Sequence, residues 1–179
     1  LLFWGGDQWH YREPNTIHDL FCMWGTDINN IHSVGGEGTY RFHDGKQFQR
    51  RDELTSEEVS LYGVWGSASD DVYIVGSHGT ILHFDGNEEG EWKPMVSGTD
   101  EYLLSVWGSC SNDIFAVGDN ATILHYDGKS WSAMESKTDK YLPKIRCLRS
   151  DCIYAVGDDG LVIRFDGKKW NDMSLGEDA

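Results

Sequence analysis

A short pattern returns along the whole chain at intervals of about 40 residues. Asp-Gly pairs start at Asp44, Asp85, Asp127 and Asp166, at separations of 41, 42 and 39 residues, and Trp-Gly pairs start at Trp24, Trp65 and Trp107. A period of this length indicates one supersecondary unit that stacks against copies of itself. The fold is therefore expected to consist of several similar units.

Each unit predicts four short strands. In the unit that begins at Leu61, residues 61–65, 71–76 and 80–84 and the segment around Trp92 have the composition of strands. Residues 72–75 are apolar throughout, which predicts a strand covered on both faces by neighbouring sheets. We therefore predict an all-β protein, a β-propeller of four-stranded antiparallel blades. A β-helix is the structural alternative, but its usual period is roughly half as long.

The repeat predicts a half blade at 1–19 and complete blades at 20–60, 61–103, 104–141 and 142–179, all in one propeller domain or fragment. Four and a half blades leave the ring short by two strands. We expect these residues to be part of a ring of five to eight blades. Self-association through the open blade edges is the alternative, because unpaired strand edges readily add a further strand.

The turns between the second and third strands carry the pairs Glu37-Gly38, His78-Gly79, Asn120-Ala121 and Asp159-Gly160. Three of these pairs end in glycine, as a two-residue hairpin turn with positive φ favours. Ala121 is the expected strained exception.

The turns between the third and fourth strands read FDGKKW, YDGKSW and FDGNEEGEW. They resemble the Asp-box, in which the Asp side chain accepts backbone N–H bonds within its own turn. Together with the Trp-Gly pairs, they make the chain similar to the Asp-box-like (BNR-like) propellers and to Ycf48-like photosystem assembly factors. The resemblance implies a binding platform and brings no catalytic residue and no cofactor with it.

The charge of the chain limits its partners. Thirty acidic residues against 15 Lys and Arg give a formal net charge of −15. Proteins that bind nucleic acid or an anionic membrane surface need a basic surface. We therefore expect this chain to bind neither nucleic acid nor such a membrane. No apolar run approaches the ~20 residues that cross a bilayer, so no membrane insertion is expected.

One face of the propeller is the candidate binding surface. The turns that hold Glu37, His78, Asn120 and Asp159 share this face with the connections between blades, which carry the acidic residues Glu53, Glu57, Glu58, Asp100 and Glu101. An acidic face attracts a basic protein partner or a divalent cation, although charged loops are often simply solvated.

Two further residue groups have two interpretations each. Trp24, Trp65 and Trp107 form either a sugar-stacking ring around the channel mouth or interblade core. His83 and His125 occupy positions held by Phe42 and Arg164 in other units, which favours packing over metal binding, and no metal site is expected.

Two cysteines in the last unit, Cys147 and Cys152, flank a predicted hairpin. A disulfide across that hairpin is expected where the Cα atoms are about 5.5 Å apart. It would indicate an extracellular, cell-surface or periplasmic setting, as for a secreted protein; two free thiols in a reducing cytosol are the alternative.

The resulting functional hypothesis is a non-catalytic scaffold for protein–protein interaction. A lectin-like propeller that binds a glycan is the first alternative, and a sialidase-type glycosidase is the second. The glycosidase would need a cluster of arginines that bind a carboxylate, and no such grouping appears among Arg12, Arg41, Arg50, Arg51, Arg146, Arg149 and Arg164.

Overall fold

The computed structural model describes residues 2–4, 7–11, 18–50, 54–56, 58–87 and 90–174. Within these ranges the protein is all-β, and its one helical segment is a 3-10 turn at Asp158–Gly160. A two-stranded sheet, β1 (Leu2–Trp4) and β2 (Trp9–Tyr11), precedes four sheets of four strands each.

The four larger sheets are named here the first to fourth blades. The first blade consists of β3 (Leu20–Asp27), β4 (Asn30–Gly35), β5 (Tyr40–His43) and β6 (Phe48–Arg50), and the second of β7 (Leu61–Ala68), β8 (Asp71–Gly76), β9 (Ile81–Phe84) and β10 (Trp92–Pro94). The third blade consists of β11 (Leu103–Cys110), β12 (Asp113–Gly118), β13 (Ile123–Tyr126) and β14 (Trp131–Ala133). The fourth consists of β15 (Lys144–Arg149), β16 (Cys152–Val156), β17 (Val162–Phe165) and β18 (Trp170–Asp172).

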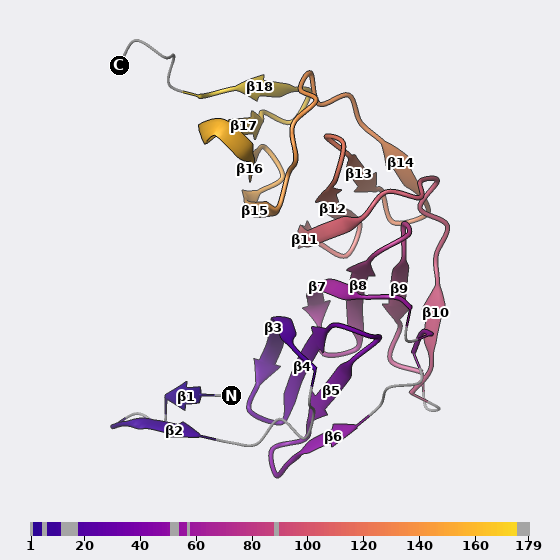
Figure 1. The fold of residues 1–179 in the computed structure, drawn as a ribbon, viewed down its shortest axis with the longest axis vertical. Coiled ribbons are helices and arrows are strands. Elements are labelled where there is room, and N and C mark those ends of the chain that lie inside the picture. Colours follow the sequence, from indigo (N-terminus) through magenta and orange to yellow (C-terminus); the bar gives the residue numbers. More distant parts are fainter. Residues whose placement is uncertain are drawn as a thin grey trace.

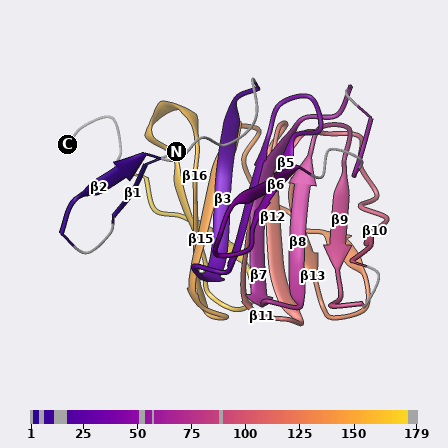
Figure 2. The same cartoon turned by 90° about the horizontal axis from the view of Figure 1, so that it is seen from below.

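Every blade is an antiparallel meander in which consecutive strands are neighbours. The blades stand side by side along an open arc, with β3, β7, β11 and β15 on its inner side (Figure 1). The strands run between two ends of the molecule, and their connections gather at those ends (Figure 2). This arrangement confirms the predicted β-propeller fold.

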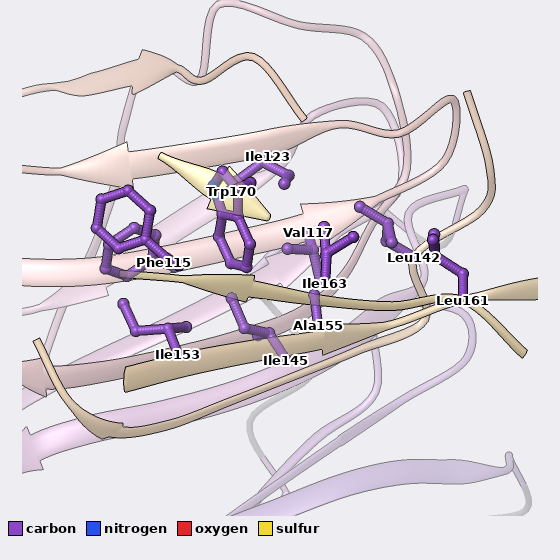
Figure 3. Packing of buried hydrophobic residues seen from close by; sticks show 11 residues of the cluster. Phe115, Val117, Ile123, Leu142, Ile145, Ile153, Ala155, Leu161, Ile163 and Trp170 are labelled. Carbon is purple, nitrogen blue, oxygen red and sulfur yellow. The ribbon is translucent and has the colours of Figure 1, made fainter. Parts of the chain in front are cut away.

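The second strands of the two middle blades, β8 and β12, are buried because sheets cover both of their faces. In the terminal fourth blade, Val156 of β16 is 41% exposed. Val72, Ile74 and Val75 in β8 have no exposed surface, as the uniformly apolar sequence predicts. The same packing joins the third and fourth blades, where Phe115 and Val117 meet Ile145, Ile153 and other apolar side chains (Figure 3).

The Trp-Gly pairs hold adjacent blades together. Trp24 lies over Gly66 of the next blade, and a Cβ atom added at Gly66 would be 2.5 Å from the Trp24 ring. Trp65 lies over Gly108 in the same way, at 2.7 Å, and it is only 6% exposed. These contacts support the interblade-core interpretation of the two tryptophans, because each ring packs on the glycine of the next blade.

The third tryptophan of this series meets a different partner. The Arg146 guanidinium lies 4.5 Å from the ring centroid of Trp107, in a cation–π contact. Trp107 is half-buried and packs against the cores on both sides of the third blade. It too is a packing residue.

The Asp-Gly corners form the predicted Asp-box turns in three blades. Asp44 accepts the N–H groups of Lys46 and Gln47 at 2.9 and 3.0 Å, and Asp127 and Asp166 accept the equivalent pair. These bonds hold the pKa of Asp44 and of Asp166 at about 2. The glycines that follow have φ between 89° and 91°. The corner therefore depends on both residues of the pair.

The disulfide predicted between Cys147 and Cys152 is not present. Cys152 is a free thiol. A bulge shifts the β15–β16 register so that Cys152 pairs with Arg149, whereas Cys147 pairs with Ile153. The cysteines are thus not opposite each other across the hairpin. The oxidising compartment, which was inferred from this bond, stays a prediction.

Among the described ranges, no helix has the length and apolarity to cross a membrane. The same part of the chain contains no group of three or more His, Cys, Asp or Glu side chains placed to hold a metal ion.

Candidate binding face

The four predicted turn residues lie at one end of the propeller, which we name the turn face. It consists of the turns at 36–39, 77–80, 119–122 and 157–161 and the connections that lead into β3, β7, β11 and β15. Glu37, His78, Asn120 and Asp159 have φ between 48° and 55°, and the next residue also has positive φ, including Ala121 at 55°. The predicted two-residue turns with positive φ are therefore confirmed, with Ala121 as the strained exception.

In three blades the turn residue contacts the residue 19 positions earlier, in the connection that enters the same blade. Glu37 contacts His18 at 3.4 Å, Asn120 donates to the Glu101 carboxylate at 2.9 Å, and Lys140 pairs with Asp159 at 3.1 Å. In the second blade the same two positions hold Val59 and His78. Because the partners change together from blade to blade, each blade presents a different chemistry at an equivalent place.

Two of the connections are fixed by a local motif that sequence reasoning missed. Ser97 and Ser136 each donate their hydroxyl to the carbonyl of the Thr two residues later. The hydroxyls of Thr99 and Thr138 then accept the N–H groups of the two residues that pair with the turns. The signal was present as the parallel segments SGTDEYL and SKTDKYL.

An aromatic stack runs along the inner rim of the turn face. Phe21 and Tyr62 are equivalent residues of β3 and β7, and their ring centroids are 5.6 Å apart and stacked. Tyr102 continues the stack at 6.1 Å from Tyr62, and His78 meets Tyr102 edge-on at 5.4 Å. Phe21 is 47% exposed and Tyr102 is 38% exposed. Apolar ring surface is thus presented to solvent on the inner side of the turn face.

Negative charge surrounds this stack. Burial and the nearby Glu101 carboxylate raise the pKa of Asp119. Burial, Asp119 and Asp158 together raise the pKa of Tyr141, which is 41% exposed. The described acidic residues of the turn face are Asp19, Glu37, Glu58, Asp100, Glu101, Asp119, Glu135, Asp139, Asp158 and Asp159, against the bases Lys137 and Lys140.

Two grooves open on the outer part of the turn face. One has a volume of ≈ 610 Å³ and is lined by His78, Thr55, Thr99 and Asp100 among others. The second has a volume of ≈ 500 Å³ and is lined by Asp159, Lys140 and Trp170 among others. His78 and Asp159 therefore line recesses and the connections between blades form the walls.

The structure therefore brings Glu37, His78, Asn120 and Asp159 to one face, where sequence reasoning placed them. It adds Phe21 and Tyr62, which sequence reasoning assigned to packing because they are strand residues, and Tyr102, which precedes β11 and was not singled out. Glu53 and Glu57 lie outside the described residues.

The two histidines at the opposite end of the blades have partners that sequence reasoning also missed. His83 contacts the Asp71 carboxylate at 2.7 Å and His125 contacts Asp113 at 2.9 Å. Ser67 and Ser109 donate to the same two carboxylates. The spacing of 12 residues between Asp and His in both blades was the available signal. Each group is a half-buried hydrogen-bond network and not a nucleophile site, because the serine contacts the carboxylate and not the histidine.

The fold and the site together define a β-propeller with an acidic, aromatic-lined face. No family model and no curated protein matches the chain. Solved structures do: streptogramin B lyase has a TM-score of 0.79 at 12% identity over 96% of this chain. Ycf48 bound to a D1 peptide has 0.71 at 17% over 90%, and Ycf48 from Cyanidioschyzon merolae has 0.65 at 13% over 94%.

These identities show a shared fold. The matches cover 55% of the peptide-bound Ycf48 chain, 63% of the other Ycf48 chain and 60% of the lyase chain. The described residues thus correspond to a part of each of those propellers.

Proposed function

We propose that this chain is a non-catalytic binding module whose turn face recognises a cationic segment of a protein partner. The observation that carries the proposal is the partly exposed stack of Phe21, Tyr62 and Tyr102 on a face that also carries the carboxylates of Glu101 and Asp119. The peptide bound to one of the similar propellers supports a role of this kind.

The chemistry of the face fits Lys and Arg side chains. A cation placed over an aromatic ring gains roughly 0.5–2 kcal/mol, depending on how far it is desolvated. The carboxylates of Glu101 and Asp119 lie beside the stack and attract the same charge, which raises the rate of encounter. A face of this composition disfavours acidic partners, because like charges repel.

The unequal pairs at the turns provide a basis for specificity. The positions that hold His18 and Glu37 in the first blade hold Lys140 and Asp159 in the fourth. A partner that crosses several blades therefore meets a different hydrogen-bonding pattern at each one, and this distinguishes a scaffold from a lectin with one equivalent site per blade.

The test is calorimetric titration with a decapeptide that contains four lysines, against a length-matched peptide with four glutamates. We expect binding of the lysine peptide only, and weaker binding as salt rises. The double variant Glu101→Gln/Asp119→Asn should weaken binding by about tenfold, since each rim charge contributes a modest amount. Tyr102→Ala should also weaken it, through loss of the ring.

The matched control is the double variant Glu91→Gln/Asp151→Asn, which removes the same charge from exposed positions at the opposite end of the blades. Equal weakening by both double variants would mean that only the net charge matters. Absence of lysine-peptide binding at low salt would refute the proposal.

A further inference from the structure

A pocket lies between the first and second blades at the end opposite the turn face. Its volume is ≈ 330 Å³, and Tyr40, Phe42, Phe84, Trp92 and His32 contribute aromatic rings to its lining. The volume is at the lower end of the range for sites that hold small ligands. It is separate from the turn face and from the peptide-binding role proposed for that face.

The pocket exists because this junction between blades departs from the repeat. Where the second and third blades have an Asp–His pair, the first blade has Asn30 and Phe42. The corner that leads to Trp92 is lengthened by inserted residues, and it is closed by two hydrogen bonds between Asn87 and the backbone of Glu91, at 2.8 and 2.9 Å. Trp92 remains half-buried, whereas Trp131 is only 8% exposed.

The walls of the pocket are aromatic side chains that pack against one another. The Trp92 ring stands edge-on to Tyr40 at 5.4 Å and to His32 at 6.1 Å, and it packs on Phe84 at 5.7 Å. A hydrogen bond of 2.9 Å joins His32 Nδ1 to the Tyr40 hydroxyl. His32 and Tyr40 are each 2% exposed, so this part of the wall is fixed before any ligand arrives.

The lip of the pocket carries one uncompensated charge. Asp70 is exposed, lies over Gly86, and forms no hydrogen bond or ion pair through its side chain with the described residues. Of the side-chain amides that line the pocket, Asn87 bonds to its own corner, and the side-chain oxygen of Asn30 accepts from Thr26. Ring faces beside a single carboxylate suit a desolvated cation better than a polyhydroxylated ligand.

We propose that this pocket binds a small organic cation of the quaternary ammonium class, such as the methylated amino group of a lysine side chain. The cation lies against Trp92 and the neighbouring rings, and Asp70 supplies the counter-charge at the entrance.

The probe is choline, titrated into the whole chain by calorimetry, with its neutral isostere 3,3-dimethylbutan-1-ol as the matched ligand. We expect choline to bind and the isostere to bind about tenfold more weakly. Asp70→Asn should weaken choline binding by about threefold to tenfold and leave the isostere unchanged.

Trp92→Ala should abolish choline binding, and Trp92→Phe should retain part of it. The control is Trp131→Phe in the next junction between blades, which should bind choline as the native protein does. Thermal melting of each variant shows that it is folded.

Equal affinity for choline and its isostere would mean a merely apolar pocket and would overturn the proposal. Binding of a methyl glycoside in place of choline would assign the pocket to sugars instead. No binding of choline by the folded native chain would also overturn it.

Discussion

Replacing Gly66 by alanine tests the packing between blades most directly. An ideal Cβ at this position would lie 2.5 Å from the Trp24 ring and 2.7 Å from the Asp71 carbonyl oxygen. Ordinary carbon contacts are about 3.5–4.0 Å, so the two obstacles must retreat by about 1 Å. One is a rigid aromatic ring that packs between blades and the other is backbone, so both resist displacement.

The cost follows from these distances. Overpacking of this kind typically costs about 1–3 kcal/mol, and we place Gly66→Ala near the upper end because neither neighbour is flexible. Alanine reduces the entropy of the unfolded chain, which recovers about 0.5–1 kcal/mol. The net destabilisation is therefore about 2 kcal/mol.

Urea unfolding followed by tryptophan fluorescence measures this change. With a slope of about 2–3 kcal/mol/M, the midpoint should fall by about 0.7–1 M. The matched control is Gly36→Ala, where the nearest atom to the new Cβ is a Phe21 ring carbon at an ordinary 3.7 Å. It should change stability by less than about 0.5 kcal/mol.

A double variant identifies the obstacle. If Trp24 resists the new methyl group, Trp24→Leu combined with Gly66→Ala should cost less than the sum of the two single changes. A Gly66→Ala protein as stable as the native chain would refute the packing described for the Trp-Gly pair.

Two further predictions concern hydrogen-bonded carboxylates. The pKa of Asp44 and of Asp166 is held at about 2, below the ordinary 3.8, so these groups stabilise the fold above pH ~4 and this stabilisation is lost as the pH falls towards 2. Changing Asp44, Asp127 and Asp166 to Asn should flatten the fall in unfolding free energy over that interval, measured by urea titration at each pH; an unchanged slope would contradict it. In the second blade, Asp71→Asn and His83→Phe should each destabilise by about 1–2 kcal/mol, because each breaks the half-buried, charged contact between the two side chains. The double variant, which reproduces the Asn and Phe of the first blade, should cost less than their sum, and strict additivity would show that the pair does not interact.

The repeat was enough to predict the fold because every strand and turn of a blade has a recognisable local sequence pattern. The apolar run at 72–75, the glycine at Gly79 and the Asp-Gly corners each correspond to the element that the structure shows. These are short-range features, and their recurrence fixed the strand order as well as the strand type.

The contacts between blades were less accessible to sequence reasoning. Trp24 and Gly66 are 42 residues apart, and only the stacked arrangement shows that the ring lies over the glycine. The cysteine prediction failed for a related reason, since a bulge in β15 shifted the register by one residue. The pairing of Asp71 with His83 could have been found in the sequence. It required noticing that the two positions change together from one unit to the next.

The pairing of residues 19 positions apart has a consequence for how such a chain changes over generations. Both members of each pair belong to one blade, so a duplicated blade carries its own surface interaction with it. The Trp-Gly contact belongs to the boundary and is the same at the two junctions that the second blade makes with its neighbours. When a gene gains, loses or exchanges a blade of this kind, the packing contact between blades is kept while the residues on the turn face change. New recognition properties can therefore be acquired one blade at a time.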